Sequence, residues 1–435
     1  MNSEYVCCGK LISFYIKGLR SLTHPLSFLE SISPIHSVTS SKQRLWIDSF
    51  IKNNKKRLNA SQTGQLNRPR DSFVVTYLRF KTDPSILDDY VNAYNTIRIG
   101  KILEDLDALA AAISFLHCGM NSLSVVTASL DRIDTKNRIP IDADVRMAGH
   151  VTFVGSSSLE VLILMDTCPD GAPEKEDFGY EASFTHARQP NSKRILSAKF
   201  TMVAMDFATN KPTKVPGLQL LTEEDNLLYE LGAQSKLQKK TALEASPSRK
   251  APRHDEMILI HDLFLESSAL KKTQIPNSIV WMKDTTQQSL VVCMPQERNL
   301  NNKMFGGYLM RLAYELAHAT GILFCKSTIG FVALDDISFK HPVNIGSILS
   351  LKSEVVYSDG GATKMFQVSV IADVIDPNGD QKTTNTFHFT FRAKNLKKNE
   401  TLPKVMPQTY AESMRYIEGK RRKEKWFIEQ IKEQH

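Results

Sequence analysis

The sequence predicts an α+β fold in which two similar units each wrap a curved antiparallel sheet around a buried helix. Three observations lead to this prediction. A strand-like run, an apolar helical stretch and several more strand-like runs follow one another twice along the 435 residues. The two helical stretches are apolar on nearly all faces, so each must be buried. The later runs alternate in polarity, as strands with one covered face do.

The first unit begins with a strand-like run at 72–77. A helix follows at 100–110, starting at Gly100 and reading Gly-Lys-Ile-Leu-Glu-Asp-Leu-Asp-Ala-Leu-Ala. A Leu-Asp-Arg-Ile segment at 130–133 and a Gly-His landmark at 149–156 come next, and strands are predicted at 159–165 and 197–204. A helix that must be buried and several antiparallel strands together indicate an α+β unit.

The second unit repeats this order. Its strand at 289–293 precedes a helix at 307–317, and then come Leu-Asp-Asp-Ile at 334–337, a His-Gly landmark at 340–347 and strands at 347–356, 365–371 and 386–392. The spacing between copies falls from 207 residues at the helix glycines to 191 at Gly155 and Gly346, so we expect an insertion in the first copy near 135–144. In this alignment His150 and His341 coincide, which predicts a shared structural role near a strand start.

These patterns set the expected domain boundaries. The first unit is placed at 70–215 and the second at 256–400. Between them, 216–255 reads as a charged helical linker that ends in a Pro/Ser/Lys stretch, and 401–435 as a basic tail with the run Lys420-Arg-Arg-Lys-Glu-Lys425 on an amphipathic helix. Residues 1–45 carry five basic against two acidic side chains and many serines, which is typical of an organelle targeting leader, although a disordered leader would have similar composition.

Composition excludes several other classes. No apolar run approaches the roughly 20 residues of a membrane helix. The net charge of +8 is small for this length and lies mostly at the two ends, so nucleic-acid binding is not expected. Six cysteines without CxxC spacing predict free thiols and no zinc site. We therefore expect no metal and no redox cofactor.

The segment most informative about chemistry leads into the second helix. It reads Pro295-Gln-Glu-Arg-Asn299, and Phe305-Gly306-Gly307 follows six residues after the asparagine. The first amides of a helix have no internal partner and carry the positive end of the helix dipole. Aimed at a carbonyl oxygen they form an oxyanion hole. Tight helix–sheet packing would also account for the two glycines.

Here the sequence resembles the acyl-coenzyme A thioesterases with two tandem hotdog domains, in particular the mitochondrial ones. The resemblance rests on Phe-Gly-Gly-Tyr-Leu-Met-Arg from 305, Ala-Tyr-Glu-Leu-Ala from 313 and Thr-Thr-Asn-Thr-Phe-His-Phe-Thr-Phe from 383, and in the first unit on 97–107 and 149–151. It covers about 70–420. The fold it implies is a double hotdog, in which a curved antiparallel sheet encloses each central helix.

The resemblance also implies where the site lies. One unit supplies an asparagine from the loop before its helix, and the other supplies an acid from its helix. Carried over by position, the pair is Asn299 and Asp107, with the Gly306 and Gly307 amides on the thioester carbonyl. Asp107 would act as general base on water or as nucleophile, and Asn299 would orient the water or the carbonyl. Read without the resemblance, Asp107 is an acid on the helix surface and Asn299 forms a turn.

The complementary pair looks degraded. Asn92 would face Tyr314, where an acid is expected, although Glu315 is adjacent; the first unit also has Ile99 where the second has Gly306. We therefore expect one productive site per chain.

The implied substrate is fatty acyl-coenzyme A, with Lys340, Arg392 and the 420–425 run as candidates for its phosphates. The implied location is the mitochondrial matrix, and the implied assembly is a homo-oligomer, a trimer of such chains. Two rival functions remain, a hotdog-fold hydratase and a non-catalytic acyl-coenzyme A binding or assembly protein.

Overall fold

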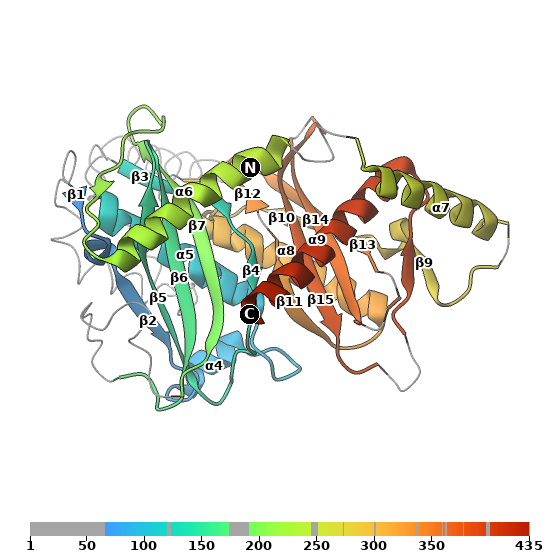
Figure 1. Ribbon diagram of the computed structural model, residues 1–435, viewed down its shortest axis with the longest axis horizontal. Helices are drawn as coiled ribbons and strands as arrows, with labels where there is room; N and C mark the ends of the chain where they lie inside the picture. Colours follow the sequence, from blue (N-terminus) through green and yellow to red (C-terminus); the bar gives the residue numbers. More distant parts are fainter. Residues whose placement is uncertain are drawn as a thin grey trace, which may run out of the picture.

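The computed structural model describes residues 66–434 apart from 120–122, 174–190, 245–250, 273, 300–301, 336, 359, 362, 377 and 397–400. The predicted leader at 1–45 lies outside the described residues. Within them the chain forms two six-stranded antiparallel sheets that lie side by side, each with a helix along its concave face (Figure 1). This arrangement confirms the predicted α+β class and the double hotdog.

The first sheet has the strand order β12-β3-β7-β6-β5-β2 and the second the order β10-β13-β14-β15-β11-β4. Period-two alternation of apolar residues, as at Phe387, Phe389 and Phe391, turns one face of each strand to the core. The strands of the first unit are β2 (Val74–Leu78), β3 (Leu123–Leu130), β4 (Ile133–Asp134), β5 (Asp144–Val154), β6 (Ser158–Cys168) and β7 (Arg194–Asp206). Those of the second are β10 (Gln287–Val292), β11 (Ile329–Leu334), β12 (Ile337–Ser338), β13 (Ile348–Tyr357), β14 (Met365–Ile375) and β15 (Gln381–Ala393).

The two central helices are α5 (Ile99–Cys118) and α8 (Gly306–Cys325). Almost every α5 side chain is buried, including all those between Gly100 and Ala110. The sheet covers one side of this helix and α8 packs against another, which explains why apolar residues lie on most of its faces. The cores of the two units join through this helix pair into one continuous apolar cluster.

The alignment of the two copies follows the predicted spacing in the helices but not beyond them. The Ser72 hydroxyl accepts a hydrogen bond from Val151 N at 3.0 Å, and the Thr285 hydroxyl accepts one from Val355 N at 2.9 Å. Val151 therefore corresponds to Val355, and Gly149 to Ser353. The predicted match of 149–156 with 340–347 is wrong: buried His150 lies inside β5, whereas exposed His341 lies in the loop before β13.

The predicted insertion near 135–144 is also wrong. Strands β6 and β14 pair with their neighbours in the same register, so Val161 corresponds to Val368 and Phe200 to Phe389. The extra residues of the first copy must therefore lie between β6 and β7, at 169–193, where the second copy has only the turn at 376–380.

The two sheets exchange their shortest strands. Strand β4 follows β3 of the first unit but pairs with β11 of the second, and β12 follows β11 but pairs with β3. An ion pair between Arg132 and Asp335, both largely buried, stabilises the exchanged strands. The pairing of β12 with β3 is extended by a hydrogen bond from Phe339 N to the Ala128 carbonyl at 2.9 Å. Each sheet thus closes on a strand from the other unit.

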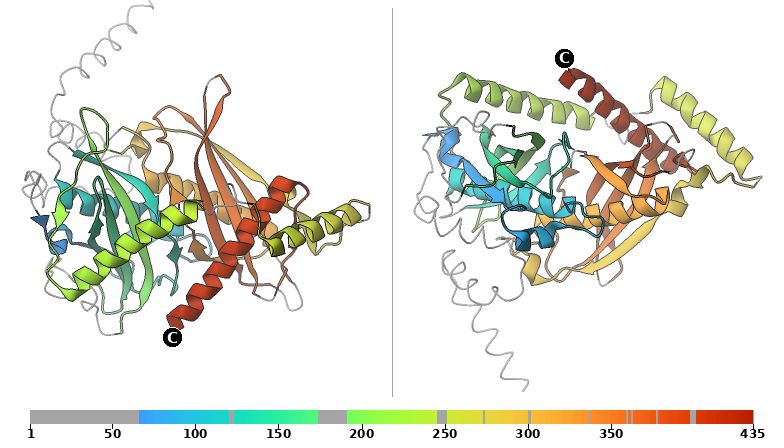
Figure 2. Two further views of the ribbon diagram at one scale, coloured as in Figure 1. Left: turned by 45° about the horizontal axis from the view of Figure 1, so that its top comes forward. Right: turned by 90° about the horizontal axis from the view of Figure 1, so that it is seen from below.

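An outer helix covers each sheet on the same side of the molecule (Figure 2). These are α6 (Glu223–Glu244), within the range predicted as a linker, and α9 (Tyr410–Gln434), within the predicted tail. Both start with the same cap, in which a threonine hydroxyl and an acid three residues later satisfy each other's backbone amides: Thr222 with Asp225, and Thr409 with Glu412. The repeat therefore includes these helices.

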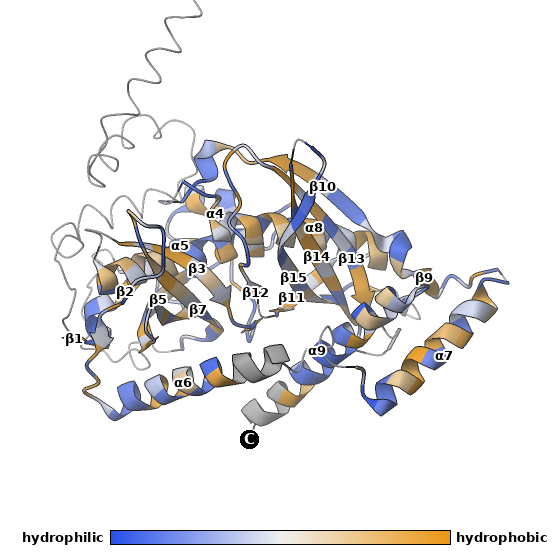
Figure 3. Ribbon diagram, turned by 90° about the horizontal axis from the view of Figure 1, so that it is seen from above, coloured by the Kyte–Doolittle hydropathy of each residue, from blue (hydrophilic) through white to orange (hydrophobic). Residues whose placement is uncertain are grey.

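The remaining elements connect and brace the two units. They are β1 (Leu66–Asn67) with β8 (Gly217–Leu218), β9 (Ile279–Trp281) with β16 (Lys404–Met406), the short helices η1 (Pro69–Ser72), η2 (Met282–Thr285) and η3 (Pro295–Glu297), α4 (Pro84–Tyr90) and α7 (His254–Leu270). Helix α7 projects from the second unit and exposes apolar residues, among them Phe264 and Leu265 (Figure 3). Among the described helices, none has the length and apolar character needed to cross a membrane.

Candidate active site

The site is built where α5 and α8 cross. A Cβ on Gly100 would lie 3.0 Å from the Arg311 side chain, and one on Gly307 would lie 2.8 Å from the Glu104 backbone. Glycine at these two positions therefore lets the start of each helix rest on the first turns of the other. Glu104 and Arg311 form an ion pair at 3.2 Å beside this crossing.

The crossing brings Asp107 of α5 onto the first turn of α8. Asp107 Oδ2 accepts a hydrogen bond from Gly307 N at 2.5 Å, and its Oδ1 accepts one from the Thr127 hydroxyl at 2.7 Å. The side chain is fully buried, and this burial raises the pKa of Asp107 to about 6, although both hydrogen bonds favour the charged form. A carboxylate in this state is suited to take a proton near neutral pH.

The neighbouring acids of α5 have other partners. Glu104 pairs with Arg311, and Asp105 accepts a bond from the Tyr90 hydroxyl at 2.5 Å. All three acids are buried, so the alternative of an acidic helix surface is wrong. Burial likewise raises the pKa of Asp105, to about 7, but its carboxylate is held by Tyr90 and not at the α8 start. Only Asp107 among them meets a helix N-terminus of the other unit.

Asn299 lies in the loop that leads to α8. Its Oδ1 accepts a hydrogen bond from Lys303 N at 3.1 Å, which fixes the side chain within this loop. Phe305 N bonds the Glu297 carbonyl at 2.9 Å and closes the loop just before the helix. Gly306 is the first residue of α8, and its missing side chain leaves space bounded by Asp107 Oδ2 and the Phe339 ring. Gly307 N–H holds Asp107, and Gly306 N–H is the adjacent first-turn amide beside this space.

Thr127 is a site residue that the sequence analysis missed. It lies on β3 next to an irregularity in the pairing with β7, and its hydroxyl reaches Asp107. The second unit has the same irregularity in β11, where Phe331 occupies the position of Thr127. No motif marks Thr127; only the strand register, which places it beside the helix, could have found it.

The complementary pair has the same backbone but different chemistry. Asn92 Oδ1 accepts from Thr96 N at 3.1 Å, as Asn299 does from Lys303, and the two loops share their backbone bonds at a spacing of 207 residues. Tyr314, at the position of Asp107, is buried among Phe331, Phe389 and other rings. Burial raises the pKa of its hydroxyl far above the usual value.

Glu315 does not replace the missing acid at this position. Its carboxylate is partly exposed and forms an ion pair with Arg98 at 2.5 Å. Arg98 precedes α5 and corresponds to Phe305.

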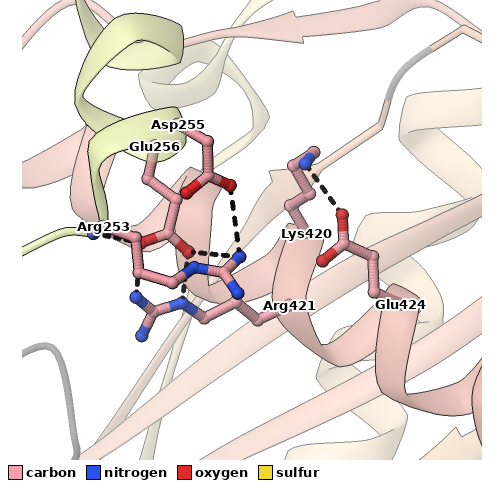
Figure 4. Close-up of polar contacts among 6 residues, drawn as sticks. All are labelled: Arg253, Asp255, Glu256, Lys420, Arg421 and Glu424. Atoms are coloured by element: carbon pink, nitrogen blue, oxygen red, sulfur yellow. Dashed lines mark hydrogen bonds and ion pairs between the residues drawn. The ribbon is translucent and has the colours of Figure 1, made fainter.

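The residues proposed for the phosphates are scattered. In the 420–425 run, Arg421 makes two bonds to the buried Glu256 of α7, and Lys420 pairs with Glu424 (Figure 4). Arg392 lies against the Trp426 ring, with 5.9 Å between the guanidinium carbon and the ring centroid. Arg421 therefore joins α9 to α7, while Lys420 pairs within its own helix. Across the described ranges, no group of three His, Cys, Asp or Glu side chains is placed to hold a metal ion.

Two hotdog units with a buried carboxylate of one on the helix start of the other define a double-hotdog protein with a candidate site between its units. Relatives place it further. The chain is 35% identical to mouse acyl-coenzyme A thioesterase 10, mitochondrial, over 88% of its own length and 83% of that protein. It is 35% identical to human acyl-coenzyme A thioesterase 9, mitochondrial (81% and 77% covered), and 32% to acyl-coenzyme A thioesterase 2, chloroplastic, of Humulus lupulus (80% and 80%). The chain belongs to the acyl-coenzyme A thioesterase family.

Solved structures that resemble the chain include the 12:0-ACP thioesterase of Umbellularia californica, 10% identical with a TM-score of 0.43, covering 78% of this chain and 99% of that one. An acyl-CoA hydrolase of Staphylococcus aureus, 24% identical with a TM-score of 0.33, covers 36% of this chain and 94% of its own. No family model matches the sequence.

Proposed function

We propose that the protein hydrolyses fatty acyl-coenzyme A to the free acid and coenzyme A at one productive site per chain, between its two units. The observation that carries the proposal is the fully buried Asp107 carboxylate, which bonds Gly307 N–H at the start of α8. Membership of the acyl-coenzyme A thioesterase family supports the same reaction.

The groups divide the work as follows. The thioester carbonyl oxygen accepts a hydrogen bond from Gly306 N–H, at the positive end of the α8 dipole. Asp107, held by Gly307 and Thr127, takes a proton from a water that attacks the carbonyl carbon, or attacks that carbon itself and is released from the resulting anhydride by water. Asn299 orients the water or the carbonyl. The carbon–sulfur bond breaks, and the thiolate leaves with a proton as coenzyme A.

The experiment measures free-thiol release from palmitoyl-coenzyme A. We expect Asp107→Asn and Asn299→Ala each to lower turnover about 100-fold or more while the fold persists. Tyr314→Phe is the matched control at the complementary pair, and its turnover stays near that of the wild type. Loss of activity in Glu315→Gln with full activity in Asp107→Asn would reverse the assignment of the two pairs.

The same samples separate the rival functions. A hydratase would remove the absorbance of an enoyl thioester without releasing thiol. A binding protein would saturate with acyl-coenzyme A and release no thiol at any enzyme concentration. Either result would replace the hydrolase reading.

The cellular setting is part of the proposal. We place the protein in the mitochondrial matrix because mouse and human relatives carry mitochondrial names, and the composition of 1–45 agrees with a targeting leader. We also propose a homo-oligomer, a trimer by the resemblance. The exposed apolar side chains of α7 support a contact between copies; they are Met257, Ile258, Phe264 and Leu265. Light scattering of the purified chain tests the assembly, and a monomer would refute it.

A further inference from the structure

The complementary pair borders an open cavity of about 660 Å³. It lies between the Asn92 loop and the start of α5 on one side and α8 with strands β11 and β15 on the other. Tyr314 and Glu315 line it. The pair that lacks the catalytic carboxylate therefore has a space of the size that small-molecule sites have, roughly 300–1,000 Å³.

The lining of this cavity combines an apolar floor with a cationic rim. The floor includes Ile97, Ile99, Ile322, Ile329 and Phe331. The basic side chains at the rim are Lys136, Arg138, Arg392 and Lys394. Glu315 is the one acid among the lining residues, and Arg98 already neutralises it. An excess of positive charge over an apolar floor suits a ligand with an aliphatic chain and an anionic head.

Arg138 and Lys394 are the best-placed cations for that head. Both also line a smaller cavity of about 300 Å³ that shares residues with the first. In the described part of the chain neither forms an ion pair, and partial burial together with the charge of Arg138 lowers the pKa of Lys394. Gly330 makes room for the Lys394 stem, because a Cβ there would lie 2.5 Å from Lys394 Cε. An anion between these two cations would relieve their repulsion.

The cavity lacks the groups that hydrolysis needs. Tyr314 stands where the other site has Asp107, Phe331 where it has Thr127, and Ile99 where it has Gly306. A tyrosine buried among aromatic rings, with its pKa raised, cannot serve as a base near neutral pH. A ligand bound here would keep its thioester.

We propose that this cavity is a second, non-hydrolysing site for an amphipathic anion, with the aliphatic chain on the isoleucine floor and the head at Arg138 and Lys394. Only the choice of fatty acyl probes rests on the proposed function. The anionic head has two sources, the carboxylate of a free fatty acid or the phosphates of coenzyme A, and separate probes distinguish them.

The test is isothermal titration of the Asp107→Asn protein with palmitate and, separately, with a non-hydrolysable thioether analogue of palmitoyl-coenzyme A. At least one probe should bind in two equivalents per chain. Arg138→Glu combined with Lys394→Glu should abolish binding of one equivalent or weaken its affinity at least tenfold. Lys272 is an exposed lysine beyond α7, and Lys272→Glu should leave the binding of both equivalents unchanged.

Ala319→Trp provides a steric version of the same test. Ala319 is exposed on α8 and lines the cavity, so tryptophan should fill the space without disturbing the core and should remove the same equivalent. One equivalent or none for both probes, or two equivalents in every variant, would overturn the proposal. Thiol release by the wild type is measured separately. If the protein does not hydrolyse acyl-coenzyme A, the number of ligand equivalents bound per chain can still be interpreted.

Discussion

Removing the Thr127 hydroxyl should move the pH dependence of hydrolysis. Asp107 works only when ionised, so kcat/KM of the wild type should rise tenfold per pH unit below about 6 and level off above it. The Thr127 hydroxyl donates to the Asp107 carboxylate at 2.7 Å and so lowers its pKa. A hydrogen bond to a charged group contributes about 1.5–3 kcal/mol, and one pKa unit is about 1.4 kcal/mol. Thr127→Val should therefore place this pKa about 1–2 higher, at roughly 7–8.

The assay follows thiol release from palmitoyl-coenzyme A between pH 5 and 9 with a pyridyl disulfide dye that reports thiols at acid pH. Thr320→Val is the matched control, because its buried hydroxyl bonds Leu316 and Ser353 roughly 20 Å along α8 from Gly306. The control should keep the wild-type midpoint. A Thr127→Val profile that is lower at every pH but has an unmoved midpoint would refute the assigned role of the hydroxyl, and a flat wild-type profile would refute Asp107 as the titrating group.

Three further predictions concern stability. The pKa of Asp107 rises from 3.8 to about 6 on folding, so ionisation of this carboxyl lowers the stability of the fold as pH rises from 3.8 through about 6. In urea, Asp107→Asn should therefore be about 3 kcal/mol more stable than the wild type at pH 7.5 and show no gain at pH 3.5. An equal gain at both pH values would contradict this pKa shift. Gly307→Ala should lower the free energy of unfolding by about 1–3 kcal/mol, because its Cβ would lie 2.8 Å from the Glu104 backbone. An unchanged urea midpoint would show that the two helices can move apart to accept the methyl group. Glu256→Gln should speed chymotryptic cleavage within α7, whereas Asp255→Asn, which pairs only at the surface, should not; equal cleavage rates would show that the Glu256 pairs do not anchor this helix.

The parts of this fold that the sequence predicts are those set by local rules. Each Asn loop is fixed by bonds within five residues, so the spacing of 207 between Asn92 and Asn299 could be read directly. The helices were recognisable because α5 and α8 are apolar on most faces. The assignment of Asp107 to the start of α8 came instead from the resemblance to the thioesterases, because no local rule links residues 200 positions apart. The structure has a hydrogen bond between Gly307 N and Asp107 at this point.

The parts that could not be predicted depend on contacts between strands. The match of His150 with His341 rests on residue identity alone. The correspondence of the strands is instead marked by the hydroxyls of Ser72 and Thr285, which accept bonds from Val151 N and Val355 N. Thr127 has no feature in the sequence that separates it from the other threonines, because its role depends on the position of β3 beside α5. The strand exchange is invisible for the same reason, since two-residue strands have no periodic pattern of their own.

The exchange of β4 and β12 has a consequence for how this chain can be divided. Cutting the polypeptide between 245 and 250 would give two fragments, each holding the edge segment that completes the other's sheet. Neither fragment produced alone could shield its last full strand, so each should be prone to aggregate, and the two made together should reassociate. The gene's repeat boundary is therefore not a boundary of autonomous folding, and evolutionary change in one half has to remain compatible with a pairing surface encoded in the other.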